Sequence, residues 1–436
     1  MQDFATLPAA PRYRLGNATL PACLAPAGLP VAGEGLVGAD LIIAEGRIAG
    51  LTAPGAAGAE GLPGLDLDRG MVLPCFADVH THLDKGHIWP RAANRDGTFA
   101  GALASVLADR DAHWNAADVA ARMEFSLRSA HAHGTRAIRT HIDSRPGLSE
   151  ISWPVFAEAR ARWAGRIALE AAPLFAIDSA LDPAFMASTL AAVEPVGRLL
   201  GAVTYMTPGL DEGLAVLFRL AAERGWDLDF HVDETLDPGA ASLRRIAETA
   251  LATRFSGRIL VGHCCSLATQ PADEAARTMD LLAQAGIGVV SLPMCNLYLQ
   301  DRVPGRTPRQ RGVTLLHELK ARGVPVMIAS DNTRDPFYAY GDMDMLEVFR
   351  ETVRIAHLDH PFGDWVATVT ATPAGWMGQE GRLATGQAAD LLLFRARTWN
   401  ELLSRPQADR IVLRAGCAID RSLPDYRDLD GLFASV

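Results

Sequence analysis

The sequence predicts an α/β protein: a (β/α)8 TIM barrel with a small β-sandwich domain built from both termini. Eight apolar runs of strand length alternate with helical patterns from about residue 71. Short β-like segments separated by Gly- and Pro-rich turns precede them, and similar short strands return near residue 380. We therefore predict a small β-domain over residues 1–70 and 380–436, and a barrel over residues 71–379.

The strands expected in the barrel are apolar runs, several of which end in ionisable residues. They read MVLPCFADVH, TRAIRTHID, IALEAAPL, GAVTYM, WDLDFHVDE, RILVGHC, GVVSLP and PVMIASD. Helical patterns lie between most of them, and several stop at a glycine such as Gly225 or Gly286, as helices that end in a left-handed residue do. Asn115 precedes Asp118 in a helix-capping arrangement. A doubly wound sheet is the alternative, but VLPCFADVHTHLD lacks the Gly-rich fingerprint expected after its first strand.

Composition limits the classes of partner. The 436 residues carry 41 Lys and Arg against 51 Asp and Glu, a net charge of −10 with no basic block, so we expect neither nucleic acid nor an anionic membrane as partner. The six cysteines form no CxxC pair, and the first residues lack the basic and apolar regions of a signal peptide. These features predict a cytoplasmic protein with a small-molecule substrate, and they leave homo-oligomers open.

Histidines and one aspartate at predicted strand ends suggest a metal site. His80 and His82 close the first strand with a spacing that points both side chains to one side of an extended chain. His231 closes the fifth strand and Asp331 the eighth. Because barrel enzymes place catalytic groups at the carboxyl ends of strands, we expect these four side chains to meet. Three imidazoles and a carboxylate suit Zn²⁺, Fe²⁺ or Mn²⁺, which makes bound water a hydroxide-like nucleophile near neutral pH.

Two further residues are candidates for proton transfer beside this site. Glu234 lies three residues after His231, where it would be a solvated loop carboxylate or, next to a metal-activated water, a proton shuttle. His263 ends the sixth strand and is placed either to hydrogen-bond that water or to be a satisfied core histidine. No other histidine is assigned to the metal. Among those left out, His141, at the end of the second strand, is the strongest further candidate.

With these residues in place, the chain resembles the amidohydrolase superfamily and, within it, the cytosine deaminase-like group. The first-strand motif is FADVHTHLDK, and RTHID, FHVDE, VGHC and SDNTRDPFYAYGDMDMLE follow in order. LIIAEGRI and GRLATGQAADLLLF resemble the signatures of the small β-domain. The resemblance covers nearly the whole chain, and the SDN-xx-DP string is its most specific part.

The resemblance implies one divalent metal ion, iron or zinc, bound by His80, His82, His231 and Asp331. It further implies that Glu234 shuttles a proton, that His263 activates or orients the water, and that Asp331 also accepts a proton. Binuclear relatives bridge two metals with a carboxylated lysine at the fourth strand. That strand reads GAVTYMTPG, and the only lysines are Lys85 and Lys320. This difference favours one metal and deamination.

Three positions depart from the cytosine deaminase pattern and bear on the substrate. Asn332 replaces the second acid of the eighth strand, Leu174 lies in the segment that holds a glutamine in the family, and Phe337 replaces a tryptophan wall. These changes favour a more apolar pocket. We therefore predict hydrolytic deamination of cytosine or a 5-substituted cytosine such as 5-methylcytosine. The alternatives are another amino-heterocycle (isoguanine, a triazine or a pterin) and a non-catalytic, metal-binding member.

Overall fold

The computed structural model describes residues 4–56 and 60–433. The chain divides into two compact units. The small unit contains residues 1–78, 128–137 and 344–424, and the large unit contains residues 79–127, 138–343 and 425–436. The turn-rich segment TAPGAAGAEGLPG includes residues 57–59, which lie outside the described part of the chain, as do the outermost residues of the predicted β-domain. The domain limits at residues 70 and 380 stay a prediction.

Parallel strands form the centre of the large unit. Within the described residues, β6, β7 and β8 form one sheet, and β10 to β14 form a second in consecutive order, with β9 paired to β11. The strands are β6 (Phe76–Thr81), β7 (Thr135–Asp143), β8 (Ala168–Leu174), β9 (Leu199–Leu200), β10 (Val203–Thr204), β11 (Asp227–Val232), β12 (Ile259–His263), β13 (Gly288–Ser291) and β14 (Val326–Ile328).

The barrel is not closed by a continuous hydrogen-bonded ladder, which corrects the expectation of a regular eight-stranded barrel. In the described residues, single bridges link the two sheets, from Thr81 to Asp331 and from Ala176 to Val203. The reason is the shortness of the edge strands β10 and β14, which cannot form longer ladders. The consecutive strand order shows no reversal point, so the doubly wound alternative is also excluded.

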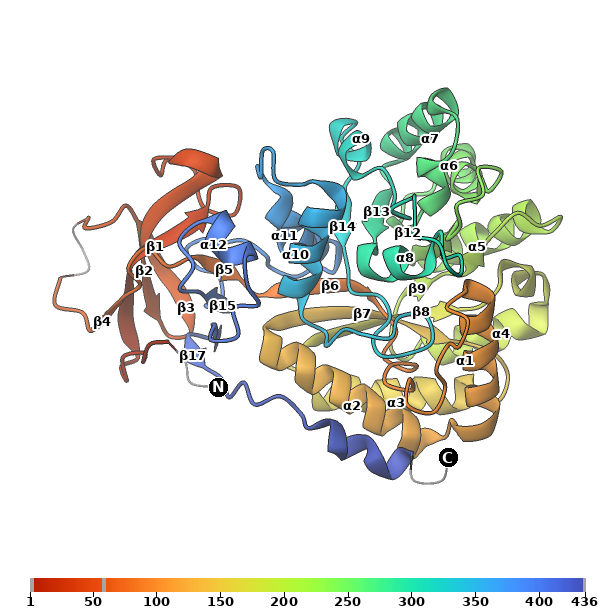
Figure 1. Ribbon diagram of the computed structural model, residues 1–436, viewed down its shortest axis with the longest axis horizontal. Coiled ribbons are helices and arrows are strands. Elements are labelled where there is room, and N and C mark those ends of the chain that lie inside the picture. The colour runs from red at the N-terminus through yellow and green to blue at the C-terminus, as the bar shows by residue number, and fades with distance from the viewer. Residues whose placement is uncertain (1–3, 57–59, 434–436) are drawn as a thin grey trace. The chain divides into compact units, whose positions relative to one another are not determined.

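Helices flank these strands, and α5, α6 and α7 lie side by side (Figure 1). Gly225 (φ 63°) and Gly286 (φ 65°) end α5 and α7 in left-handed conformations, as predicted. Asn115 Oδ1 accepts the backbone N–H groups of Ala117 and Asp118 and caps α2. The helices are α1 (Phe99–His113), α2 (Ala116–His133), α3 (Ser149–Arg162), α4 (Pro183–Val193), α5 (Leu210–Arg224), α6 (Ser242–Thr253), α7 (Ala272–Ala285), α8 (Pro293–Leu299) and α9 (Leu316–Ala321).

The small unit contains strands from both ends of the chain, as predicted. In its described part, one sheet has the order β3-β2-β1-β4 and a second, antiparallel sheet has the order β17-β16-β15-β5. Apolar side chains of both sheets, such as Leu15 and Leu391, share one buried cluster. The elements are β1 (Arg12–Pro21), β2 (Leu36–Ala44), β3 (Arg47–Thr52), β4 (Gly64–Asp66), β5 (Val72–Pro74), β15 (Leu391–Leu393), β16 (Ile411–Arg414), β17 (Cys417–Ala418), α10 (Met345–Ala356), α11 (Ala371–Trp376) and α12 (Trp399–Leu403).

A buried ion pair lies at the start of α10 in the small unit. Asp344 accepts the backbone N–H of Leu346 as the N-cap of this helix. Its two carboxylate oxygens accept hydrogen bonds from Arg410, at 2.8 and 2.6 Å. Burial alone would raise the pKa of Asp344, but Arg410 and His133 outweigh it and hold that pKa well below its usual value.

Among the described residues, no helix combines the length and apolar composition that crossing a bilayer requires.

Candidate active site

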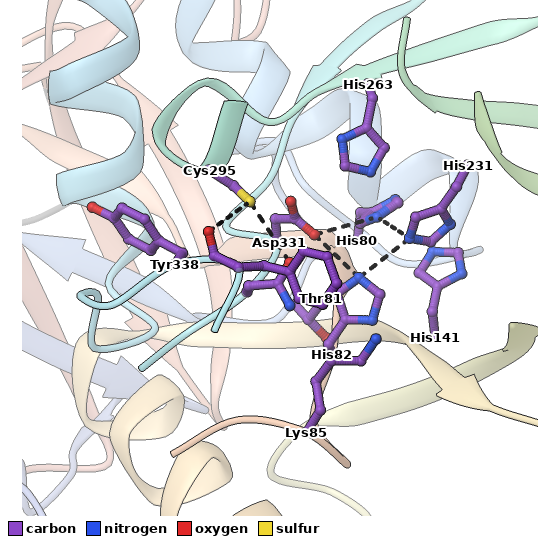
Figure 2. A network of polar contacts seen from close by, with 12 residues as sticks. His80, Thr81, His82, Lys85, His141, His231, His263, Cys295, Asp331 and Tyr338 are labelled. Atoms are coloured by element: carbon purple, nitrogen blue, oxygen red, sulfur yellow. Dashed lines mark hydrogen bonds and ion pairs between the residues drawn. The ribbon is translucent and has the colours of Figure 1, made fainter. Parts of the chain in front are cut away.

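The four predicted metal ligands meet at the carboxyl ends of their strands. The Nε2 atom of His231 lies 3.1 Å from that of His80 and 3.2 Å from that of His82. Asp331 Oδ1 lies 3.1 Å from His82 Nε2 and 3.6 Å from His80 Nε2. Figure 2 shows these side chains pointing toward one another. The backbone fixes their register, because the Asp331 N–H donates to the carbonyl of His80 at 3.0 Å.

The chemistry of these donors suits a divalent ion, and His80, His82 and Asp331 form one of the donor groups whose atoms are near enough to share an ion. Ligand atoms about 2.1 Å from a tetrahedral ion lie about 3.4 Å apart, close to the measured separations. All four residues are buried. Burial, reinforced by neighbouring cationic and histidine side chains, lowers the pKa of His80, His82 and His231 well below its usual value. The imidazoles are therefore neutral, as metal coordination requires. The Nδ1 atoms of these three rings have no hydrogen-bond partner within the described residues.

The strand ends around this cluster have unusual backbones. His263 (φ 69°), Asp331 (φ 64°) and Asp233 (φ 46°) adopt left-handed conformations that non-glycine residues rarely occupy. Such residues cost about 1–3 kcal/mol each and concentrate at functional sites. Gly262 has a different role, since a Cβ there would lie 2.7 Å from Cε1 of His80. The absence of a side chain at Gly262 makes room for the His80 ring.

Glu234 and His263 form a polar group beside the cluster, connected by Asn296 of α8. The Asn296 amide donates to His263 Nδ1 at 3.0 Å and to Glu234 Oε1 at 3.3 Å. Since Nδ1 of His263 accepts this bond, the neutral ring carries its proton on Nε2. That nitrogen has no partner among the described residues. Burial lowers the pKa of His263 to about 3, so the ring stays neutral.

Glu234 itself is in an environment that favours its protonated form. Its side chain is 15% exposed. Burial, with the nearby Asp331 carboxylate, raises the pKa of Glu234 well above its usual value. Gln300 donates to the Glu234 carbonyl at 3.1 Å and fixes the loop after β11. A carboxyl group held this way can carry a proton near neutral pH.

His141, which the sequence does not assign to the metal, lies directly against the rings of His80 and His231. Its ring centroid is 4.2 Å from that of His80 and 4.4 Å from that of His231. Its Nε2 atom is 3.7 Å from Asp229 Oδ1. Asp229 in turn accepts a hydrogen bond from Arg139 at 2.9 Å. His141 therefore packs behind the ligand rings and links them to a buried ion pair.

The cluster opens into a cavity of about 470 Å³, within the usual range for small-molecule sites. Leu174, Asn332 and Phe337, the predicted substrate contacts, all line it. Asn332 is also engaged by the protein, since its amide donates to Asp335 Oδ2 at 2.6 Å and its Oδ1 accepts from the Cys295 thiol at 3.7 Å. The other lining residues are His82, Lys85, Phe99, Leu103, Arg110, Asp143, Phe175, Ala176, Val203, Tyr205, His231, Glu234 and His263.

Comparisons with known proteins identify the family. The Amidohydrolase family profile matches residues 157–417. The chain is 56% identical over 430 residues, 98% of each protein, to a pterin deaminase of Rhizobium rhizogenes. The chain belongs to the amidohydrolase family. A second relative in the family, the N-isopropylammelide isopropyl amidohydrolase of a Pseudomonas species, is 24% identical over 83% of this chain and 87% of its own length.

Solved structures of other proteins share the amidohydrolase fold described above. The 5-methylcytosine deaminase of Klebsiella pneumoniae, liganded with 5-fluorocytosine, aligns with a TM-score of 0.80 at 23% identity. The alignment covers 94% of this chain and 98% of that one. At this level of identity the likeness shows the fold alone.

Proposed function

We propose that this amidohydrolase is a metal-dependent pterin deaminase. The observation that carries the proposal is the 56% identity to a protein named pterin deaminase over 98% of both chains. The converging donors of His80, His82, His231 and Asp331 support it. The cytosine-like ring expected from the sequence gives way to the pterin alternative, because the likeness to 5-methylcytosine deaminase rests on 23% identity.

The proposed cofactor is one divalent ion, Zn²⁺ or Fe²⁺, held by His80, His82, His231 and Asp331. When bound, such an ion lowers the pKa of water to about 7 and so supplies a nucleophile at neutral pH. A pair of bridged ions has no lysine ligand here, since β9, β10 and the residues between them contain none. Purified protein should hold about one equivalent of metal, and His80→Ala should lose it.

The side chains around the cluster then carry out hydrolysis of the bond between C2 and the amino group. The water oxygen bonds to C2 of the pterin ring, and Glu234 moves a water proton to a ring nitrogen. His263 donates from Nε2 and orients the attacking water. Asp331 accepts the remaining hydroxyl proton and passes it to the amino group; the C2–N bond then breaks, ammonia leaves, and C2 becomes a carbonyl. The neutral His263 ring and the raised pKa of Glu234 suit these roles.

Ammonia release from a panel of rings tests the assignment. The panel contains pterin, cytosine, 5-methylcytosine, isoguanine and an amino-triazine, and His80→Ala is the control for a contaminating activity. We expect pterin to give the highest kcat/KM by about 100-fold or more, because sites that hydrogen-bond one ring discriminate steeply against others. A higher kcat/KM for 5-methylcytosine would return the function to the cytosine class.

A further inference from the structure

Lys85 is a buried cation in the wall of the active-site cavity. It follows His82 by three residues, in the loop after β6, and only 4% of it is exposed. It lines the same cavity as His82, Glu234 and His263. Figure 2 shows its side chain beside His82. An isolated ammonium is costly to bury, so its neighbours indicate what holds it there.

The protein holds Lys85 through one shared carboxylate. Asp143, the last residue of β7, lies 3.1 Å from Lys85 Nζ through Oδ1 and 2.7 Å from Arg110 Nη2 through Oδ2. Two cations therefore share one counter-charge. The nearby Asp84 carboxyl accepts the backbone N–H of Asp143 at 2.9 Å.

The Lys85 ammonium has more N–H donors than its protein partner uses. An ammonium carries three N–H donors, and Asp143 is its one ionic or hydrogen-bonding partner within the described residues. The Phe337 ring, whose centroid is 5.5 Å from Nζ, covers another side of the ammonium. A substrate atom that accepts hydrogen bonds would satisfy the remaining donors. A substrate group that only donates could not, because an ammonium has no lone pair to accept with.

We propose that Lys85 donates a hydrogen bond to the C4 carbonyl oxygen of the pterin ring, and so selects 4-oxo over 4-amino pteridines. This inference rests on the proposed function. Asp143 and Arg110 are positioning residues that hold the ammonium at the cavity wall. In 2,4-diaminopteridine the C4 oxygen is replaced by an amino group, which turns its N–H donors toward Lys85 and leaves both sides of the contact unsatisfied.

The experiment measures kcat/KM for pterin and for 2,4-diaminopteridine in the wild type and in Lys85→Met, together with metal content. We expect the wild type to prefer pterin. In Lys85→Met, kcat/KM for pterin should fall about 10- to 150-fold, the range for a hydrogen bond to a charged group. Turnover of 2,4-diaminopteridine should hold or rise, so the preference falls by at least the same factor. Lys320→Met, at the only other lysine, is the matched control and should keep both values.

The outcomes separate this inference from the proposed function. If the wild type releases ammonia from neither pteridine, the proposed function fails. If the wild type uses the two pteridines equally well, Lys85 does not select the carbonyl, and no variant is needed to show it. If Lys85→Met keeps its metal but loses activity on both rings by the same factor, Lys85 acts on the chemistry rather than on C4, and the proposal is overturned.

Discussion

Three buried carboxyl groups of the large unit, those of Asp229, Asp335 and Glu234, behave in the opposite way to Asp344 of the small unit. In the small unit, Asp344 makes two hydrogen bonds to Arg410, and its pKa lies well below the usual value. In the large unit, burial raises the pKa of Asp229 to about 7 despite a contact with Arg139, and raises that of Asp335 to about 6. Burial with the nearby Asp331 raises the pKa of Glu234 as well. Asp344 stabilises the fold as a carboxylate. Burial instead makes the ionised forms of Asp229, Asp335 and Glu234 costly.

The direction of the pKa shift helps to distinguish a structural carboxylate from a catalytic acid. Structural carboxylates are paired with full counter-charges and stay ionised, whereas a catalytic acid must be able to take up a proton near working pH. If the contrast is right, substitutions in the two units should separate stability from catalysis.

The largest effect is expected from Glu234→Gln. The amide keeps the shape of the side chain but cannot carry a proton, so kcat should fall by about 10²–10⁴ while metal content and unfolding free energy stay near the wild type. Steady-state ammonia release and metal analysis measure this. Glu212→Gln, at an exposed position on α5, is the control. Turnover near the wild-type rate would make Glu234 an ordinary loop carboxylate and remove one side of the comparison.

The next effect is expected from Asp344→Asn, on stability alone. Removing the charge leaves Arg410 buried without its partner, which typically costs about 3–5 kcal/mol. Because the folded-state pKa of Asp344 is lowered, its contribution is fully present above the unfolded pKa of about 3.9 and is lost as pH falls through the folded value. Denaturant unfolding should therefore show a gap at pH 7 that narrows below about pH 4.

Asp273→Asn controls for charge removal, since its pair with Arg277 is exposed and contributes little. A fall in metal content or in kcat at pH 7, with unfolding free energy unchanged, would contradict the structural role of Asp344.

The smallest effect is expected from Asn296→Ala. This amide positions Glu234 and His263 rather than reacting. Asn296→Ala removes two hydrogen bonds, so kcat should fall about 10-fold. A double-mutant cycle sharpens the test, because residues in one network are not additive. In the Glu234→Gln background, Asn296→Ala should cost much less than in the wild type. Additive losses would show that Asn296 acts independently of Glu234.

Much of the site could be predicted because its chemistry is local to strand ends. A histidine or aspartate directly after a buried apolar run must appear at the carboxyl edge of a parallel sheet, and this brought His80, His231 and Asp331 together in the structure. The helix-ending glycines and the Asn115 cap follow from backbone preferences of the same local kind, and the structure confirms them.

The remaining features depend on contacts between segments that are distant in sequence. Closure of the sheet depends on the lengths of β10 and β14, which apolar runs do not fix. Asn296 lies in a short helix with no distinctive motif. The role of Lys85 can be inferred only from its ion pair with Asp143, which is distant in sequence. The ring could not be read from Leu174 and Phe337, because apolar walls accept many flat molecules.

The close approach of the His80 ring to Gly262 limits which residues can occupy position 262. This glycine lies on β12, where a Cβ would come within 2.9 Å of His80 Nδ1 and 2.7 Å of Cε1. A library that varies the cavity wall to accept new rings can therefore sample Leu174, which lines the cavity, but should return only glycine at position 262. The constraint comes from the absence of a side chain at Gly262, because any Cβ there would press on the His80 ring.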